Sequence, residues 1–503
     1  MHLQHQALCL LARIAEELLE DVGDVAHQIH RVVPDDRHPR GIRPDVGFWP
    51  FDFHRCGTHS RHRKVFAVTS TALLTDRYEL TMVQAALRSG AAHRRSIFEV
   101  FARRLPKGRR YGVVAGTGRL VEALQHFRFT EAELRWLRDE QVVDAATIEW
   151  LANFRFSGHI DGYAEGDVYF PGSPILVVEA TFAEAVLLET LVLSILNFDS
   201  AVASAASRMV QAAGDRPCLE MGSRRTHEIA AIAAARAAYL AGFAATSNLE
   251  AGRRYGIPTV GTAAHAFTLV HDDEESAFRA QLQTLGNATT LLVDTFDVSR
   301  AVATAVRLAG PELGAIRIDS GDLVTQARAV RRQLDELGAT KTRIVVTGDL
   351  DEFAIAALSA APVDAYGVGT SVVTGSGAPT ANLVYKLVAR CDERGTWHAV
   401  QKESPGKIGH GGRKWAFRRF DGGVAVGEVI VARPGPEPPK PPAGIGDADQ
   451  PLLVPLIRDG EIVASEPLDA ARRRHAAARS ALPPAALHLQ PGDPALRPTF
   501  VDA

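Results

Sequence analysis

The chain has 503 residues, 46% of them hydrophobic, which is enough for roughly two to four domains and a large buried core. Its 56 Lys and Arg residues against 59 Asp and Glu give a net charge of -3, so we expect neither nucleic acid nor a membrane as a partner. The four cysteines lack CxxC spacing, which argues against a disulfide framework or a zinc ribbon and favours a cytoplasmic protein.

Residues 1–66 differ in composition from everything that follows. They hold eight of the 18 histidines and four prolines that interrupt any long element. We interpret this leader as a disordered segment or as the product of a start site upstream of the true one, near Val65 or Val68. One cluster within it has no standard zinc spacing and lies among arginines, so we do not expect it to bind a metal: His54, Cys56, His59 and His62.

The segment 67–181 is predicted as the N-terminal part of a β-rich domain. Thr75 is expected to cap a helix that carries Tyr78 and Met82 on one face. Residues 96–101 alternate in the manner of a half-buried strand, and residues 156–178 are predicted as short strands separated by glycine-containing turns.

Residues 182–390 show a different rhythm, typical of an α/β barrel. Their first part, 182–213, is helical in pattern, and the longest apolar run of the chain, 185–198, is too short and too polar to span a bilayer. Seven short apolar strands follow, most of them separated by helical patterns, and predict a closed or nearly closed, irregular TIM-like barrel of parallel strands. These strands are Cys218–Met221, Phe243–Thr246, Pro258–Gly261, Thr290–Val293, Ala315–Ile318, Arg343–Val346 and Val363–Tyr366.

Residues 391–503 are predicted to complete the β-rich domain. Strands are expected around Trp397, over 415–420 and over 424–431, followed by a Pro-rich linker at 433–442. Two short strands within 452–463 and a helix over 468–482 close the chain. No GxGxxG or GxxxxGK[ST] motif occurs, which excludes a Rossmann dinucleotide site and a P-loop.

The most informative stretch runs from Gly314 to Leu323. Side chains alternate along a strand, so Ile316 and Ile318 face one side while Arg317 and Asp319 face the other. Residues 319–322 then supply a tight turn and a helix cap. The charged pair belongs either to an active site at the end of a barrel strand or to a structural ion pair that closes the barrel.

The segments that directly follow the barrel strands should meet at one rim. Two glycine-rich turns, at 348 and 367–369, offer backbone N–H groups to a phosphate, and Arg224, Arg225 and Arg317 offer guanidinium groups to oxyanions. Their composition predicts a phosphorylated substrate. Four carboxylates are candidate Mg²⁺ ligands: Asp294, Asp319, Asp322 and Asp349. His265 is a general base, a nucleophile toward phosphorus or a core histidine.

With these motifs in order along the chain, the sequence resembles the nicotinate phosphoribosyltransferase family. The resemblance implies an irregular α/β barrel, a smaller β-rich domain built from both chain ends, and a homodimer with active sites at the subunit interface. It rests on Thr75-Asp-Arg-Tyr78, Gly222-Ser-Arg-Arg225, Gly261-Thr-Ala-Ala-His-Ala-Phe267, Arg317-Ile-Asp-Ser-Gly-Asp322, Thr347-Gly-Asp-Leu350, Gly367-Val-Gly-Thr-Ser371 and Tyr385-Lys-Leu387.

The resemblance implies transfer of phosphoribose from 5-phosphoribosyl 1-pyrophosphate to nicotinate in NAD biosynthesis, coupled to ATP hydrolysis. His265 would be phosphorylated by ATP, and Thr262 and Arg317 would contact nicotinate. Tyr78 of the neighbouring subunit would pack on the pyridine ring. The remaining expected roles are substrate binding by Arg224, Gly348, Asp349, Gly369 and Thr370, orientation of the ribose by Asp319, and Mg²⁺ binding by Asp319 and Asp322.

One position departs from the family pattern and leaves the choice of ring open. Met221 stands where related enzymes commonly place an aromatic residue, and a thioether packs on a pyridine ring less rigidly. The alternative activity is that of a nicotinamide phosphoribosyltransferase, but Arg224 and Arg225 favour the acid. An inactive phosphate-binding protein would not need His265, and an aldolase would need a lysine at a strand end.

Overall fold

The computed structural model describes residues 70–402, 409–438, 446 and 448–502. The chain divides into two units, 1–65 and 66–503, and every described residue belongs to the second. The interpretation of residues 1–66 and part of the predicted linker, 439–442, therefore lie outside the described residues.

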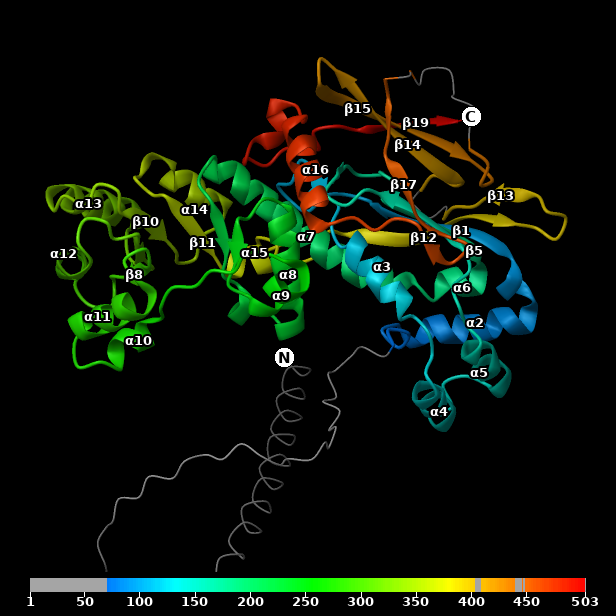
Figure 1. The fold of residues 1–503 in the computed structure, drawn as a ribbon. Helices are drawn as coiled ribbons and strands as arrows, with labels where there is room; N and C mark the ends of the chain where they lie inside the picture. Colours follow the sequence, from blue (N-terminus) through cyan, green and yellow to red (C-terminus); the bar gives the residue numbers. More distant parts are fainter. Residues whose placement is uncertain (1–69, 403–408, 439–445, 447, 503) are drawn as a thin grey trace, which may run out of the picture. The chain divides into compact units, whose positions relative to one another are not determined.

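A seven-stranded antiparallel sheet joins segments from both sides of the barrel region in the order β13-β12-β1-β5-β3-β17-β18 (Figure 1). Its pairs bring the 95–181 part of the chain against residues 383–462. The strands are β1 (Arg95–Ala102), β3 (His159–Tyr163), β5 (Leu176–Thr181), β12 (Leu383–Cys391), β13 (Trp397–Ala399), β17 (Leu453–Arg458) and β18 (Glu461–Ile462).

Smaller sheets and helices complete this β-rich part. In the four-stranded sheet, β14 and β15 form a long hairpin, and the last strand β19 pairs in parallel with β15. A two-stranded sheet pairs β2 with β4. The elements are β2 (Gly112–Val113), β4 (Val168–Tyr169), β14 (Arg413–Asp421), β15 (Val424–Arg433), β16 (Gln450–Pro451), β19 (Pro498–Asp502), α2 (Arg77–Ser89), α3 (Thr117–Gln125), α4 (Glu131–Asp139), α5 (Ala145–Ala152) and α16 (Leu468–Ser480).

Helix α2 corrects one prediction. It begins at Arg77, with Asp76 at the N-cap position and no side-chain capping bond, so Thr75 does not cap it. The Thr75 hydroxyl is buried without a hydrogen-bond partner, one position too early to reach the first turn.

A long helical stretch separates the β-rich part from the parallel sheet. It consists of α6 (Phe182–Val186) and α7 (Glu189–Ala213). Residues 182–213 are long and apolar enough to cross a membrane, with a mean hydropathy of 1.6, but 67% of the most apolar window is buried inside the fold. Helix α7 contacts α8, α14, α3 and β12. Packed on several sides, it behaves as the core helix of a folded protein.

The parallel sheet has six strands in the order β7-β6-β11-β10-β9-β8. Ala-rich helices cover it, and their small side chains allow close packing, as where α8 meets α7. The strands are β6 (Cys218–Glu220), β7 (Ala245–Thr246), β8 (Thr290–Leu292), β9 (Ala315–Ile318), β10 (Arg343–Val346) and β11 (Ala365–Val368); the helices are α8 (Glu228–Leu240), α9 (Leu249–Tyr255), α10 (His265–Leu269), α11 (Glu274–Leu285), α12 (Val298–Ala309), α13 (Leu323–Glu336), α14 (Glu352–Ala357) and α15 (Thr370–Val373).

The sheet is a curled half-barrel rather than the predicted closed or nearly closed barrel. One of the seven predicted strands, Pro258–Gly261, does not form. This segment makes a single bridge, from Thr259 to Thr246. Proline has no N–H to donate, and residues 258–261 are exposed, so the apolar burial that holds the other strands is missing here. The sheet therefore stays open between this segment and β8.

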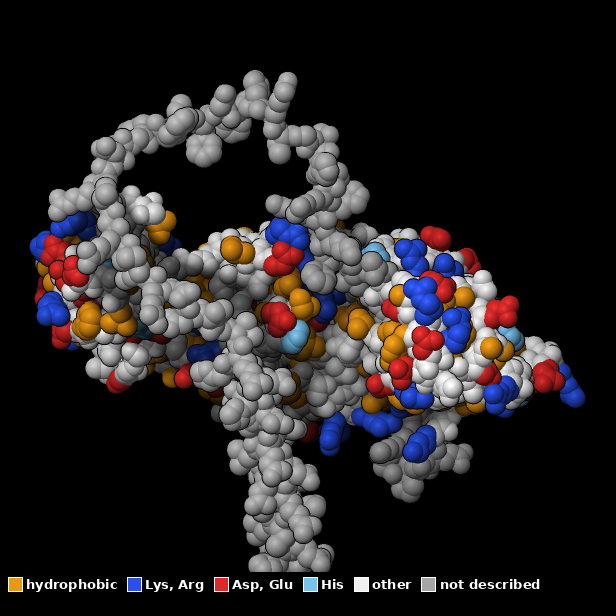
Figure 2. Space-filling model, turned by 90° about the horizontal axis from the view of Figure 1, so that it is seen from below, with side chains coloured by type: hydrophobic (Ala, Val, Ile, Leu, Met, Phe, Trp, Pro, Cys, Tyr) orange, Lys and Arg blue, Asp and Glu red, His pale blue; other side chains and the backbone are white. Residues whose placement is uncertain are grey.

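The surface carries charges of both signs. On the face shown in Figure 2, Lys and Arg side chains alternate with Asp and Glu across both ends of the described fold. This mixture agrees with the net charge of -3 and gives this face no extended field of one sign.

Candidate active site

Strand β9 places the Arg317–Asp319 pair at its carboxyl end, on the rim where the parallel strands end. Ile316 and Ile318 are fully buried in the core on one side of the strand. On the other side, Arg317 Nη2 donates to Asp319 Oδ1 at 2.7 Å. The alternation predicted from the sequence is confirmed, and so is the helix cap that follows, because Asp322 Oδ1 accepts from Thr325 N.

The guanidinium of Arg317 connects β9 to Thr347, which follows β10, and to residues 262–263. Its Nε donates to Thr347 Oγ1 at 2.9 Å, and its Nη1 donates to Thr262 Oγ1 at 3.0 Å and to the Ala263 carbonyl at 3.3 Å. Thr347 also donates to Asp319. Burial of Asp319 opposes its ionisation, but the hydrogen bonds from Thr347 and Arg317 outweigh burial and lower the pKa of Asp319.

His265 opens helix α10 and faces a second carboxylate. Its Nε2 lies 3.1 Å from Asp294 Oδ1, while its side chain is 39% exposed, so His265 is not a core histidine. Asp294 Oδ2 accepts from Asp319 N at 2.9 Å and from Ser320 Oγ at 2.7 Å. Asp294, considered above only as a metal ligand, thus orients His265 through Nε2, and no hydrogen bond within the described part of the chain engages Nδ1.

The two glycine-rich turns come to the same rim. Gly348 has a φ of +103°, and a Cβ there would lie 2.2 Å from the Asp319 carbonyl oxygen, so this turn packs directly on the end of β9. Asp349 beside it is exposed. Gly369 is the N-cap residue of α15, and Thr370 starts that helix in an exposed position.

Met221 lies on the concave side of the sheet. A Cβ on Gly367 would lie 2.8 Å from Met221 Sδ and 2.4 Å from Thr347 Cγ2, so all three residues meet at one place beside Arg317. The thioether therefore forms part of a floor next to the guanidinium, and a side chain at residue 367 would collide with it.

Two groups of predicted site residues lie outside the hydrogen-bonded network around Arg317. Arg224 and Arg225 are exposed on a short 3-10 turn and form no ion pair with the described residues. Tyr78 is 44% exposed on α2, and Figure 1 shows α2 and strand β8 at opposite ends of the described fold. Burial and the nearby carboxylates of Glu189 and Glu79 raise the pKa of Tyr78 to about 12.

The carboxylates do not form a cage for a metal. Among the described residues no three His, Cys, Asp or Glu side chains are grouped closely enough to hold one. Both oxygens of Asp322 accept from Thr325 in the helix cap.

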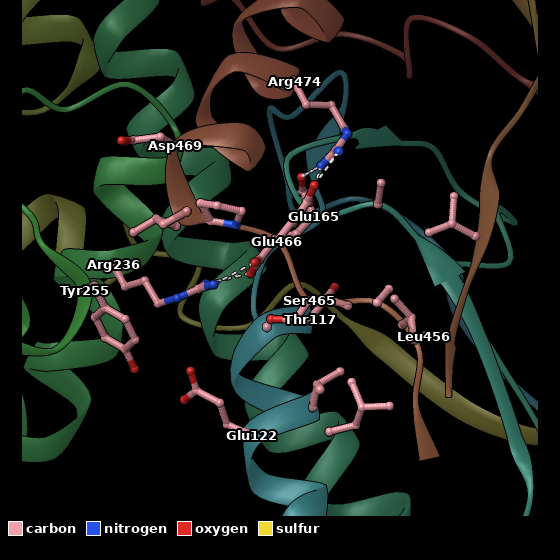
Figure 3. A pocket seen from close by; sticks show the side chains of 18 of the residues that line it. Thr117, Glu122, Glu165, Arg236, Tyr255, Leu456, Ser465, Glu466, Asp469 and Arg474 are labelled. Carbon is pink, nitrogen blue, oxygen red and sulfur yellow. Dashed lines mark hydrogen bonds and ion pairs between the residues drawn. The ribbon is translucent and has the colours of Figure 1, made fainter. Parts of the chain in front are cut away.

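A large cavity of about 670 Å³ lies away from these residues (Figure 3). It opens between α3, α8, α9 and the segment 454–469, and it includes none of the strand-end residues. Four of its charged groups are paired, since Arg236 pairs with Glu165 at 2.6 Å and Arg474 pairs with Glu466. The convergent, partly exposed groups needed for chemistry are at the strand ends instead.

Thr347 and the orienting role of Asp294 were not predicted from the sequence. Both follow a buried strand directly, and that position is the signal that could have identified them.

Comparison with known proteins identifies relatives of this chain. A family model described as the nicotinate phosphoribosyltransferase (NAPRTase) N-terminal domain matches residues 73–197. The chain is 60% identical over 432 residues to nicotinate phosphoribosyltransferase pncB1 of Mycobacterium tuberculosis, covering 84% of this chain and 94% of that protein. It is 39% identical over 364 residues to nicotinate phosphoribosyltransferase of Bacillus subtilis, covering 70% and 74% of the two chains.

A solved structure agrees with these sequences. The crystal structure of human nicotinic acid phosphoribosyltransferase superimposes with a TM-score of 0.71 at 27% identity, covering 85% of this chain and 97% of the human one. From its strand-end residues, its fold and its identity to these relatives, the chain belongs to the nicotinate phosphoribosyltransferase family.

Proposed function

We propose that the protein transfers phosphoribose from 5-phosphoribosyl 1-pyrophosphate to nicotinate, giving nicotinate mononucleotide and pyrophosphate for NAD biosynthesis. The observation that carries this function is the convergence of Arg317, Thr262, Asp319, Thr347 and His265 at one rim. It occurs in a chain that is 60% identical to a nicotinate phosphoribosyltransferase over 94% of that enzyme.

Nicotinate fits beside Met221 and Arg317. Thr262 and Arg317 line one edge of this floor, where the planar guanidinium can face a carboxylate. Arg224 and Arg225 are exposed and unpaired among the described residues, which leaves them available for the carboxylate. A carboxylate gains more from these cations than an amide does, which favours nicotinate over nicotinamide.

Transfer breaks the bond between ribose C1 and the pyrophosphate oxygen and forms a bond from C1 to the ring nitrogen. Positive charge grows on the ribose, and the ionised Asp319 lies where it can stabilise that charge. The N–H groups at Gly348 and Gly369, with Thr370 and Asp349, surround the phosphoribosyl part. Mg²⁺ carried with the pyrophosphate and held by Asp319 would neutralise the leaving group.

ATP hydrolysis is coupled through His265. With Nε2 held by Asp294, the free Nδ1 attacks the γ-phosphorus of ATP, the bond to ADP breaks, and a phosphohistidine forms. Phosphorylation brings about two negative charges to the rim, where the exposed Arg224 and Arg225 can close over the substrates.

The active unit is a cytoplasmic homodimer in this proposal. Tyr78 is exposed on α2 and remote from the strand ends of its own chain, so a second copy must supply it to the ring. Tyrosine presented in this way adds a flat apolar surface to the nicotinate site.

The test is to offer the purified protein nicotinate, nicotinamide or quinolinate separately, each with 5-phosphoribosyl 1-pyrophosphate, ATP and Mg²⁺, and to identify the mononucleotide. We expect nicotinate mononucleotide from nicotinate at a kcat/KM far above that for the other two. Nicotinamide mononucleotide as the main product would establish the nicotinamide enzyme instead.

A further inference from the structure

Glu220, the last residue of β6, is a buried carboxylate without a cationic partner. It is 1% exposed, and burial raises its pKa above the ordinary value. No ion pair joins it to any described Lys, Arg or His, although an unpaired buried carboxylate normally costs stability. Its hydrogen bonds explain why a glutamate stands here.

Both carboxylate oxygens accept hydrogen bonds from neighbouring strand ends. Oε1 accepts from Gly222 N and Oε2 accepts from Thr246 Oγ1, each at 2.5 Å. The Thr246 hydroxyl in turn accepts from Asn248 N at 3.0 Å, and Asn248 Nδ2 donates to Ser223 Oγ at 3.0 Å. Together these bonds form a ring that joins the turn after β6 to the turn after β7.

Both oxygens of residue 220 act as acceptors in this ring. The Gly222 amide can only donate, so Oε1 must accept from it, while Thr246 Oγ1 accepts from Asn248 N and gives its one proton to Oε2. A glutamine can keep the bond from Gly222 N only by directing its NH₂ group at Thr246 Oγ1, whose proton then loses its acceptor. Glutamate is therefore the side chain of this length that completes the ring.

The ring fixes the turn that carries Met221, Arg224 and Arg225. Met221 N donates to the Val368 carbonyl at 2.8 Å, and Arg225 N donates to the Gly222 carbonyl at 2.8 Å. A Cβ on Gly222 would lie 2.9 Å from the Gly369 carbonyl oxygen and 2.2 Å from Val373 Cγ1, so this turn is also packed against the β11 end.

We propose that Glu220 is a positioning residue for nicotinate, holding the turn of residues 221–225 in the shape that receives the ring and its carboxylate. It does so through Gly222, Thr246, Asn248 and Ser223, without touching the substrate. This inference rests on the proposed function and adds to it the residues that set the affinity for nicotinate.

The test uses four variants: Glu220→Gln, Thr246→Val, the double variant, and Thr246→Ser, which keeps the hydroxyl. We expect the KM for nicotinate to rise at least about tenfold in each single variant, because a buried donor or acceptor is left without a partner, while kcat changes less. The double variant should be no worse than the poorer single one, since both break one ring. Thr246→Ser should stay close to the wild type.

Glu428→Gln is the matched control. Glu428 is also a buried strand glutamate, accepting from Tyr163, Ser173 and Arg418, but it lies in β15 of a different sheet. Its loss should lower the melting temperature without changing the KM for nicotinate.

The inference fails if the wild type makes nicotinate mononucleotide while either Glu220→Gln or Thr246→Val, still folded, keeps its KM for nicotinate. It also fails if Glu428→Gln raises that KM equally, because general loosening would then explain the effect. A wild type that does not use nicotinate would instead refute the proposed function itself.

Discussion

Arg317 is the residue on which the candidate site most depends. Three of its nitrogen atoms each bond to a different partner side chain: Thr347, Thr262 and Asp319. No other side chain can make this fork, because lysine offers one nitrogen at the end of a flexible chain.

We predict that Arg317→Lys lowers kcat/KM for nicotinate at least about a hundredfold. Two charge-assisted hydrogen bonds worth roughly 1.5–3 kcal/mol each are lost, and Asp319 and Thr262 lose their fixed partner. Steady-state kinetics checks this. Arg216→Lys is the control. Arg216 lies just before β6 and donates to two backbone carbonyls and to the Tyr366 hydroxyl, so its substitution should leave kcat/KM unchanged. Equal activity of Arg317→Lys and the wild type would contradict the role given to Arg317.

Glu79, beside Tyr78, makes stability depend on pH. Its Oε1 accepts from Thr190 N at 2.9 Å and Oγ1 at 2.7 Å, but its buried Oε2 has no partner. Burial, with repulsion from Glu189, raises its pKa from 4.5 to about 7. Between these two pH values the folded state therefore holds a proton that the unfolded chain releases. The contribution of Glu79 to the free energy of unfolding falls as the pH rises from about 4.5 to about 7, and it stays at the lower value above pH 7.

Glu79→Gln keeps the acceptor for Thr190 and cannot ionise. We predict that it is more stable than the wild type at pH 8 by on the order of 1–3 kcal/mol, and that the difference disappears toward pH 5. Urea unfolding at a series of pH values measures this. The exposed Glu140→Gln should show no such trend. A Glu79→Gln curve parallel to that of the wild type would show that folding does not raise the pKa of Glu79.

Turns between elements decide how closely the strand ends approach. Gly348, at a φ of +103°, would place a Cβ 2.2 Å from the Asp319 carbonyl oxygen, whereas Gly338, at a φ of +78°, has nothing within 4 Å. Both positions strain an alanine, but only Gly348 is also crowded.

We predict that Gly338→Ala costs about 1–2 kcal/mol and leaves kcat/KM unchanged, because only the left-handed backbone is strained. Gly348→Ala should cost more and should also lower kcat/KM, because the turn must move away from Asp319. Thermal unfolding and kinetics of the pair separate the two effects. Equal loss in both variants would show that the close approach has no functional consequence.

Some strands of the parallel sheet were predicted correctly from the sequence, and one was not. Strands β9 and β10 have the predicted limits because each is a short apolar run between turn residues. Pro258–Gly261 resembles them in composition, yet it lies exposed at the sheet's edge and makes one bridge. Composition does not report which run finds a partner strand on both sides, so the open sheet could not be predicted.

The candidate site was predictable as a set of strand ends but not as a network. Gly348, Thr262 and Arg317 follow from their places after or on apolar strands. The bond of Asp294 to His265, the central position of Thr347 and the ring around Glu220 depend on side-chain directions across separate strands. Those directions are set by packing, which a single sequence does not contain.

At the scale of the whole molecule, the proposed dimer divides each active site between two chains. His265 lies at the strand ends, whereas Tyr78 lies on α2 at the other end of the described fold. A site that uses His265 of one chain and Tyr78 of the other has a distinctive genetic consequence.

We predict that Tyr78→Ala and His265→Ala are each strongly impaired alone but complement one another when co-expressed. Random pairing gives about half mixed dimers, each with one intact site, so about a quarter of the wild-type activity should return. Activity of the purified mixture measures this, with separately purified and unmixed chains as the control. A mixture no more active than the average of its components would mean that Tyr78 acts in its own chain or not at all.

Phosphorylation of His265 is the central step of the proposed reaction. Wild-type protein incubated with ATP labelled at the γ-phosphate should carry an acid-labile, base-stable label on the peptide containing His265, and addition of nicotinate and 5-phosphoribosyl 1-pyrophosphate should discharge it as nicotinate mononucleotide forms. His265→Ala should take up no label while keeping the wild-type melting temperature. An unlabelled wild type that still hydrolyses ATP with nicotinate turnover, or a label that persists in His265→Ala, would contradict it.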